Sequence, residues 1–132
     1  MGIGYNLISV RISPRRIAAN WKLLAARGGD PWPVVKADAY GHGLAGVVRE
    51  LAAAGAGDFC VGSVGEAAQL LDAVPGVRAL SLLGPVDRAE CAEAVGRGVL
   101  CFAGRFEQLA MLAEAARDAG RPARVALKFD TG

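Results

Sequence analysis

Residues 58–83, DFCVGSVGEAAQLLDAVPGVRALSLL, decide the fold class because they contain one complete strand–helix–strand unit. The runs at 58–62 and 77–83 are short and apolar without strict alternation, which is typical of parallel strands covered on both faces. Between them, Ser63 and Glu66 have the spacing of a capping box, which predicts the start of a helix. The unit therefore predicts a parallel α/β fold.

The same alternation of apolar runs and helix-like stretches extends in both directions from this unit. The predicted strands are PWPVVKA (31–37), DFCVG (58–62), VRALSLL (77–83), VLCFA (99–103) and ARVALKF (123–129). The predicted helices begin near Ser13, Leu44, Ser63, Asp87 and Arg105, and most are followed by a glycine. Parallel strands joined by helical crossovers build either an open doubly wound sheet or a barrel.

Helical spacing also predicts which side chains pack inward. In the first helix Ile17, Trp21 and Leu24 share one face, which leaves Lys22 in solvent. In the last helix the residues predicted to face inward are Phe106, Leu109, Leu112, Ala113 and Ala116.

Composition excludes several classes of protein. The 132 residues carry 15 basic and 13 acidic side chains, a balance that offers no positive field to a nucleic acid. No apolar run is long enough to cross a membrane, and the first residues lack the layout of a secretory signal. The cysteines Cys60, Cys91 and Cys101 are odd in number and never in CxxC spacing, which favours neither a disulfide framework nor a metal site. These features predict a soluble, cytoplasmic, globular protein.

Lysine is rare in this chain, and two of the three lysines, Lys36 and Lys128, lie where chemistry is expected. Lys36, in VVKADAYGHG (34–43), is placed at the end of a predicted strand, and the carboxyl ends of strands form the active-site face of βα folds. Flanking apolar residues would desolvate its ammonium and lower its pKa, and a neutral amine can attack an aldehyde. Placement alone leaves two interpretations: a Schiff-base lysine, or a lysine that only extends into solvent at the rim.

Other polar residues accompany this lysine. The hydroxyl of Tyr40 could reach a phosphate on the same face, and the glycines around His42 could present N–H groups to an anion. His42 is the only histidine and has no second ligand at a metal-binding spacing, so a role in the turn is expected. In ALKFDTG (126–132), Lys128 again lies near the end of a strand. If Lys36 and Lys128 both point into a barrel, they converge on one mouth of that barrel. Glu66 needs no further role, because the capping box accounts for it.

The segments VVKADAYGHG and ALKFDTG resemble the pyridoxal-phosphate lysine motif and the later lysine-Asp-Thr-Gly segment of the alanine racemase family. Asn20, GSVGEAAQL (62–70) and LSLLGP (80–85) fit the same family in order. The resemblance implies an α/β fold in which residues 1–132 form the N-terminal part of a TIM-like (β/α) barrel domain, with its first five or so βα units. It also implies that Lys36 binds pyridoxal 5'-phosphate as an internal aldimine and acts as a catalytic base. Tyr40 would bind the cofactor phosphate, and Lys128 matches a lysine that is frequently carbamylated.

The resemblance further implies interconversion of L-alanine and D-alanine, which supplies D-alanine for peptidoglycan, by a cytoplasmic homodimer. A tyrosine from the C-terminal β domain of the partner subunit would be the second base. The chain stops at Gly132, before the arginine, the remaining strands and that β domain, so we expect an incomplete racemase that is inactive alone. The alternatives are a racemase for serine or several amino acids, a non-catalytic pyridoxal-phosphate-binding barrel protein, and a βα domain without cofactor.

Overall fold

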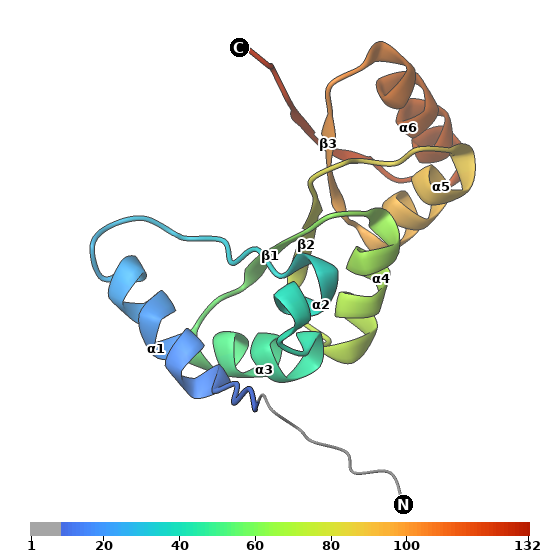
Figure 1. Ribbon diagram of the computed structural model, residues 1–132. Coiled ribbons are helices and arrows are strands. Elements are labelled where there is room, and N and C mark those ends of the chain that lie inside the picture. The colour runs from blue at the N-terminus through green and yellow to red at the C-terminus, as the bar shows by residue number, and fades with distance from the viewer. Residues whose placement is uncertain (1–8) are drawn as a thin grey trace, which may run out of the picture.

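The computed structural model describes residues 9–132 and shows helices alternating with parallel strands (Figure 1). Its strands are β1 (Asp58–Val61), β2 (Arg78–Ser81), β3 (Leu100–Ala103) and β4 (Arg124–Leu127). Its helices are α1 (Pro14–Ala25), α2 (Lys36–Gly41), α3 (Leu44–Ala54), α4 (Val64–Ala73), α5 (Arg88–Arg97) and α6 (Phe106–Asp118). Four of the predicted strands and all five predicted helices are confirmed, the strands being shorter than their apolar runs.

The order of the strands decides between a barrel and a doubly wound sheet. The four strands form one parallel sheet in the order β1-β2-β3-β4. Right-handed crossovers in an order that never reverses place every helix on the same side, whereas a doubly wound sheet needs a reversal. In Figure 1, α4, α5 and α6 follow one another along one side of the strands. The chain is therefore part of a TIM-like barrel.

The predicted strand at 31–37 is the exception, because only Val34 forms a β-bridge, with Cys60 in β1. Around it, Val35 N–H donates to the Cys60 carbonyl and Cys60 N–H to the Pro33 carbonyl, both at 2.8 Å. Pro31 and Pro33 have no N–H to donate, so the ladder cannot extend backwards. The segment still occupies the position beside β1 that a first barrel strand takes.

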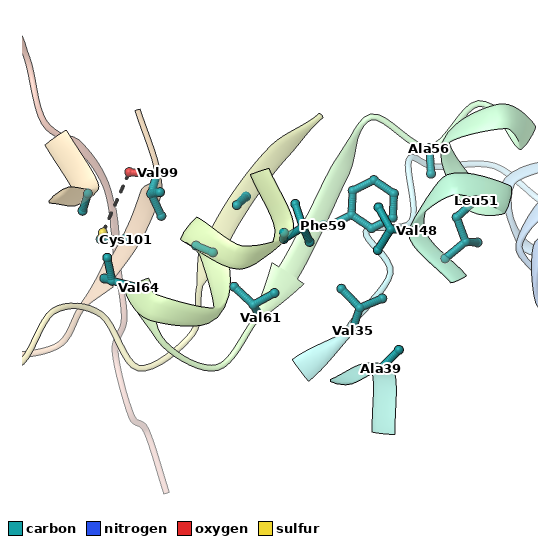
Figure 2. Packing of buried hydrophobic residues seen from close by; sticks show 14 of the residues in the cluster. Val35, Ala39, Val48, Leu51, Ala56, Phe59, Val61, Val64, Val99 and Cys101 are labelled. Atoms are coloured by element: carbon teal, nitrogen blue, oxygen red, sulfur yellow. Dashed lines mark hydrogen bonds between the residues drawn. The ribbon is translucent and has the colours of Figure 1, made fainter. Parts of the chain in front are cut away.

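One continuous core lies between the sheet and its helices. Figure 2 shows Phe59 of β1 against Val48 of α3, with Val35 close by. The fully buried side chains of this core include Phe59, Leu51, Leu70, Leu112, Val48, Val61 and Val64. The core therefore joins the segment before α2 to the last helix, and the described residues form one packed unit.

Three inward-facing predictions are wrong, because Leu24 is 58% exposed, Phe106 is 87% exposed, and Ala113 is exposed as well. The buried stripe of α6 contains Gln108, Leu112 and Ala115 instead. Phe106 is the first residue of α6, just after the end of β3, and its side chain is left in solvent there. Gln108 is buried because its amide finds hydrogen-bond partners inside, which a pattern of apolar spacing does not reveal.

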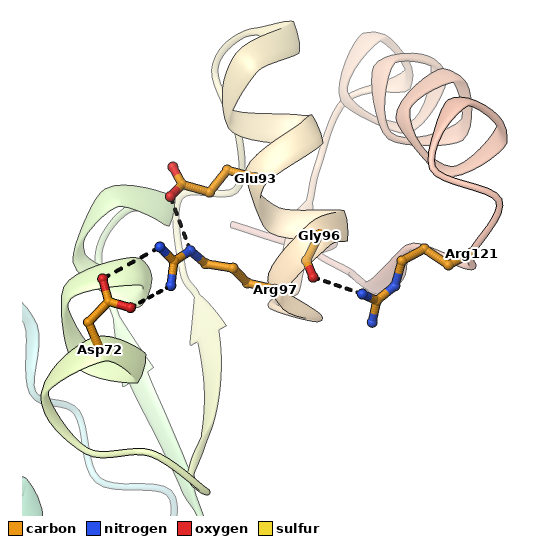
Figure 3. Close-up of polar contacts among 5 residues, drawn as sticks. All are labelled: Asp72, Glu93, Gly96, Arg97 and Arg121. Carbon is orange, nitrogen blue, oxygen red and sulfur yellow. Dashed lines mark hydrogen bonds and ion pairs between the residues drawn. The ribbon is translucent and has the colours of Figure 1, made fainter.

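Ion pairs on the outer surface join successive helices (Figure 3). Arg97 of α5 donates to Asp72 of α4 at 2.7 Å and to Glu93 of its own helix at 3.2 Å. Arg121, ahead of β4, donates to the Gly96 carbonyl at 2.7 Å. Exposed ion pairs each stabilise a fold by about 0–1 kcal/mol, so these contacts add little to the stability that the core provides.

Residues 9–132 can also be described with respect to membrane spans, metal-binding groups and cysteines. Among them, no helix has the length and apolar character needed to cross a membrane. The same residues contain no group of three or more histidine, cysteine or acidic side chains placed to hold a metal ion. The cysteines Cys60, Cys91 and Cys101 are free and buried, and burial raises the pKa of the Cys101 thiol to about 11.

Candidate active site

Both candidate lysines lie at the carboxyl edge of the sheet. A Cβ built on Gly62, the residue after β1, would lie 3.8 Å from the Cβ of Lys36. A Cβ built on Gly104, after β3, would lie 4.0 Å from the Cβ of Lys128. Each lysine thus packs beside a glycine at the end of the neighbouring strand, at opposite ends of the strand order. That the two amines meet in one barrel mouth stays a prediction.

The segment after Lys36 makes up most of α2, and it has a backbone that L-residues rarely adopt. Four successive residues, Ala37 to Tyr40, have φ between 51° and 56°, so the turn is left-handed. Such a conformation costs about 1–2 kcal/mol per non-glycine residue. Strain of this kind is concentrated at functional sites, where the surrounding structure must hold it.

Hydrogen bonds from both sides hold this left-handed turn. Ala39 N–H donates to the Val35 carbonyl at 2.9 Å, and the Asp38 carboxylate accepts the Leu44 N–H at 2.7 Å. The Nδ1 of His42 lies 2.8 Å from the Ala39 carbonyl oxygen, which confirms the expected role of this histidine in the turn. The turn is therefore tied to the segment before it, through Val35, and to α3 after it.

The turn brings Lys36 and Tyr40 together. The Nζ atom of Lys36 lies 5.9 Å from the centroid of the Tyr40 ring, within the range of a cation–π contact. Both side chains are exposed, so their amine and hydroxyl are open to a ligand. Val35 is buried in the core, whereas Ala37 is exposed. The flanking residues therefore do not desolvate Lys36 as the sequence led us to expect.

Glu66 has a role that the sequence did not reveal. The capping prediction is confirmed for its backbone, because Glu66 N–H donates to Ser63 Oγ at 3.2 Å. Its carboxylate, however, accepts the Gly62 N–H at 2.6 Å and the Ala37 N–H at 2.9 Å. The capping box is thus only part of the explanation, since the same carboxylate contacts the residue that follows Lys36.

Gln108 joins the loops between the two lysines and was also missed. Its Nε2 donates to the carbonyls of Leu83 and Pro85 at 3.2 Å, and its Oε1 accepts the Gly104 N–H at 3.2 Å. A Cβ at Gly84, whose φ is +68°, would clash with the Phe102 carbonyl. The loop after β2 is therefore locked onto the end of β3, and its glycine is required there.

An ion pair between two neighbouring strands of the sheet lies at the opposite, amino edge. Asp58 is buried at the start of β1 and accepts two hydrogen bonds from the Arg78 guanidinium. This pairing holds the pKa of Asp58 below its ordinary value, although burial acts in the other direction, and Arg124 at the start of β4 lowers it further. The amino edge is thus built for stability, and the exposed amines lie at the carboxyl edge.

Comparison with known proteins gives one consistent family. Residues 12–132 match the family described as "Alanine racemase, N-terminal domain". The alanine racemase of Nitratidesulfovibrio vulgaris (Miyazaki F) is 44% identical over the whole chain, which spans 35% of that protein. The structure of "Alanine Racemase from Streptomyces coelicolor A3(2)" superposes with a TM-score of 0.82 at 36% identity, over 92% of this chain and 33% of the other.

Two further solved structures bear on cofactor and substrate. The alanine racemase from Bartonella henselae "with covalently bound pyridoxal phosphate" is 26% identical, with a TM-score of 0.81 over 92% of this chain and 34% of that one. The histidine racemase from Leuconostoc mesenteroides is equally similar, at 26% identity and a TM-score of 0.81, over 92% of this chain and 33% of that one. The chain therefore spans about a third of the length of the proteins that it matches.

Proposed function

This chain belongs to the alanine racemase family, and from that premise we propose that it supplies the cofactor lysine of a pyridoxal-phosphate-dependent alanine racemase. The observation that carries the proposal is the exposed Lys36 amine at the carboxyl edge, with the Tyr40 ring 5.9 Å away. An amine that can attack an aldehyde and a hydroxyl that can bind a phosphate fit the two functional ends of this cofactor. The substrate of the whole protein would be alanine.

The chemistry expected of the chain follows from these groups. Pyridoxal phosphate, when bound, supplies an aldehyde for amines and a ring that withdraws electrons from the substrate Cα–H bond. Lys36 would hold the cofactor through its amine until the substrate amine replaces it. The freed Lys36 amine would then take a proton from Cα, or return one, on its own face of the substrate. Tyr40 would donate its hydroxyl hydrogen to a phosphate oxygen and keep the ring oriented.

Inversion at Cα needs a second acid–base group on the opposite face, and we assign it to the rest of the protein. Residues 1–132 would be the N-terminal part of the barrel domain, with the remaining strands and a C-terminal β domain supplied elsewhere. That β domain would bring the second base from the partner subunit of a homodimer. Lys128, at the far end of the sheet, is the candidate for carbamylation. The whole protein would act in the cytoplasm and supply D-alanine for peptidoglycan.

A racemase acting on another amino acid is the second candidate. It is favoured by the histidine racemase, which this chain resembles as closely in fold as it resembles several alanine racemases. Lys36 and Tyr40 would serve both candidates equally, because in their proposed roles they would contact the cofactor and not the substrate side chain. Turnover of a panel of amino acids by the full-length protein separates the two.

Trapping the cofactor tests the proposal directly. The chain is mixed with pyridoxal phosphate, reduced with borohydride, digested and mapped by mass spectrometry. We expect the pyridoxyl group on Lys36 in preference to the solvated Lys22, and its loss in Lys36→Ala. With L-alanine and excess cofactor, the 132-residue chain should form almost no D-alanine. Absence of label from Lys36 at every cofactor concentration would contradict the proposal.

A further inference from the structure

Glu66 binds two backbone segments with one carboxylate. One oxygen accepts the Gly62 N–H, ahead of α4, and the other accepts the Ala37 N–H, 29 residues earlier in the chain. A Cβ built on Gly62 would lie 3.0 Å from Glu66 Oε2 and 3.8 Å from the Cβ of Lys36, so the three residues pack together. The carboxylate thus lies directly against the segment that carries the candidate cofactor lysine.

The next helix shows what capping alone requires. At the start of α5, Asp87 accepts the Glu90 N–H at 2.8 Å, as Ser63 accepts the Glu66 N–H in α4. Glu90 Oε2 accepts the Val86 N–H at 2.9 Å, and Val86 holds the position in α5 that Gly62 holds in α4. One oxygen therefore completes this type of helix start. The second oxygen of Glu66 has no part in capping and is committed to Ala37.

The bond to Ala37 acts on the peptide unit that leaves Lys36. Ala37 is the first of the four left-handed residues, and its N–H belongs to the peptide plane shared with Lys36. Fixing that plane fixes ψ of Lys36 and therefore the orientation of the lysine backbone relative to the turn. Because the left-handed turn is disfavoured on its own, it needs contacts of this kind to keep one orientation.

We propose that Glu66 is a positioning residue for Lys36, acting through the Ala37 N–H and holding the lysine in the orientation that receives the cofactor. This inference rests on the proposed function, since it assigns the cofactor to Lys36. Glu66 itself would contact neither the lysine amine nor the cofactor. Glu66 would raise the fraction of chains in which Lys36 has the orientation that receives the cofactor.

The decisive variant is Glu66→Gln, with Glu90→Gln as its matched control. A glutamine side chain has one oxygen and one NH₂ group, so at position 66 one of the two backbone N–H groups would face another donor. At position 90 the single oxygen of glutamine still satisfies Val86. The two substitutions are chemically identical and occur at equivalent helix positions, and they differ only in the contact with the Lys36 segment.

Two measurements on the 132-residue chain read out the effect. In borohydride trapping with pyridoxal phosphate, we expect the ratio of Lys36 to Lys22 labelling to fall about tenfold in Glu66→Gln, the size of one charge-assisted hydrogen bond. Without cofactor, amide hydrogen exchange at Ala37 should become about tenfold faster in the same variant. Both quantities should stay within about twofold of wild type in Glu90→Gln.

The outcomes separate this inference from the proposed function. Unchanged labelling and unchanged Ala37 exchange in Glu66→Gln would overturn the positioning role, as would an equal loss in Glu90→Gln, which would indicate general destabilisation. A wild-type chain with no preference for Lys36 would refute the proposed function. The cofactor-free exchange measurement would then still decide whether Glu66 holds the backbone after Lys36.

Discussion

Lys36 and Lys128 leave the same edge of one parallel sheet, yet their surroundings differ. The residues after Lys36 form a turn bonded to Glu66 and to α3. Lys128 donates its N–H to the Ala103 carbonyl at 2.9 Å, and its neighbours Leu127 and Phe129 are 59% and 80% exposed. The segment of the first lysine is bonded to two other elements, whereas the second lysine is held by pairing with β3.

The difference shows how much a strand end depends on the loops around it. β4 has a strand partner on one side among the described residues, and its side chains are only partly covered. The segment of Lys36 also pairs on one side, but a disfavoured backbone there is compensated by hydrogen bonds from two other elements. A rigid site can therefore be built at the end of a sheet when neighbouring helices supply the acceptors.

The largest expected effect contrasts two phenylalanines, one near each lysine. Phe59 in β1 is fully buried, so Phe59→Ala should lower the free energy of unfolding by about 3–5 kcal/mol. Phe129, next to Lys128, is 80% exposed, and Phe129→Ala should change it by about 0.5 kcal/mol or less. Urea denaturation followed by circular dichroism measures both. Equal losses would contradict the difference between the two ends.

A smaller, pH-dependent effect on stability is expected at the amino edge of the sheet, where Asp58 begins β1. Because pairing with Arg78 lowers the pKa of Asp58 in the folded chain, the carboxylate adds stability above its unfolded pKa of about 4. That contribution is lost as the pH falls through the lowered folded-state pKa. Asp58→Asn should therefore reduce stability at neutral pH, and its difference from wild type should shrink under more acidic conditions.

Denaturation over a pH series checks this expectation. Asp72→Asn is the control, because it removes a carboxylate from an exposed pair with Arg97 and should have little effect at any pH. A deficit of Asp58→Asn that grows as the pH falls would contradict the assignment of the lowered pKa to Asp58.

The smallest expected effect lies in the left-handed turn. Ala37 is exposed with φ of 51°, a conformation that glycine adopts without penalty. Ala37→Gly should raise the free energy of unfolding by about 0.5–1 kcal/mol. Ala45→Gly, in right-handed α3, is the control and should lower it by a similar amount. A loss of stability in Ala37→Gly would show that the turn is not held in this conformation.

The fold was predictable because its signals are local. Apolar runs located four strands, and the Ser63 and Asp87 caps located the starts of two helices. The strand at 31–37 was overestimated because its apolar character outweighed the two prolines that restrict pairing. Phe106 was placed inside by spacing alone, although the interior position belongs to Gln108, whose amide bonds the loops of β2 and β3.

The site was predictable only in part. Lys36, Tyr40 and Lys128 were named from the motif, and the structure shows the first two side by side while their assigned roles remain proposals. The contact of Glu66 with Ala37 had no local signal, because the sequence of a capping box is the same whether or not its carboxylate also binds a distant segment. The starts of α4 and α5 place Glu66 and Glu90 at the same spacing, so this spacing offered no hint that only the Glu66 carboxylate reaches another segment.

The sequence by itself determined the α/β class, the order of strands and helices, and the lysine motif, because capping, apolar runs and turn residues act within a few positions of the chain. Only the tertiary structure decided that the strands follow one another without reversal and that the turn after Lys36 is left-handed. It also decided that Glu66 binds Ala37 across 29 residues. These features depend on which strands lie side by side, because parallel pairing brings the end of one strand next to the helix that follows its neighbour.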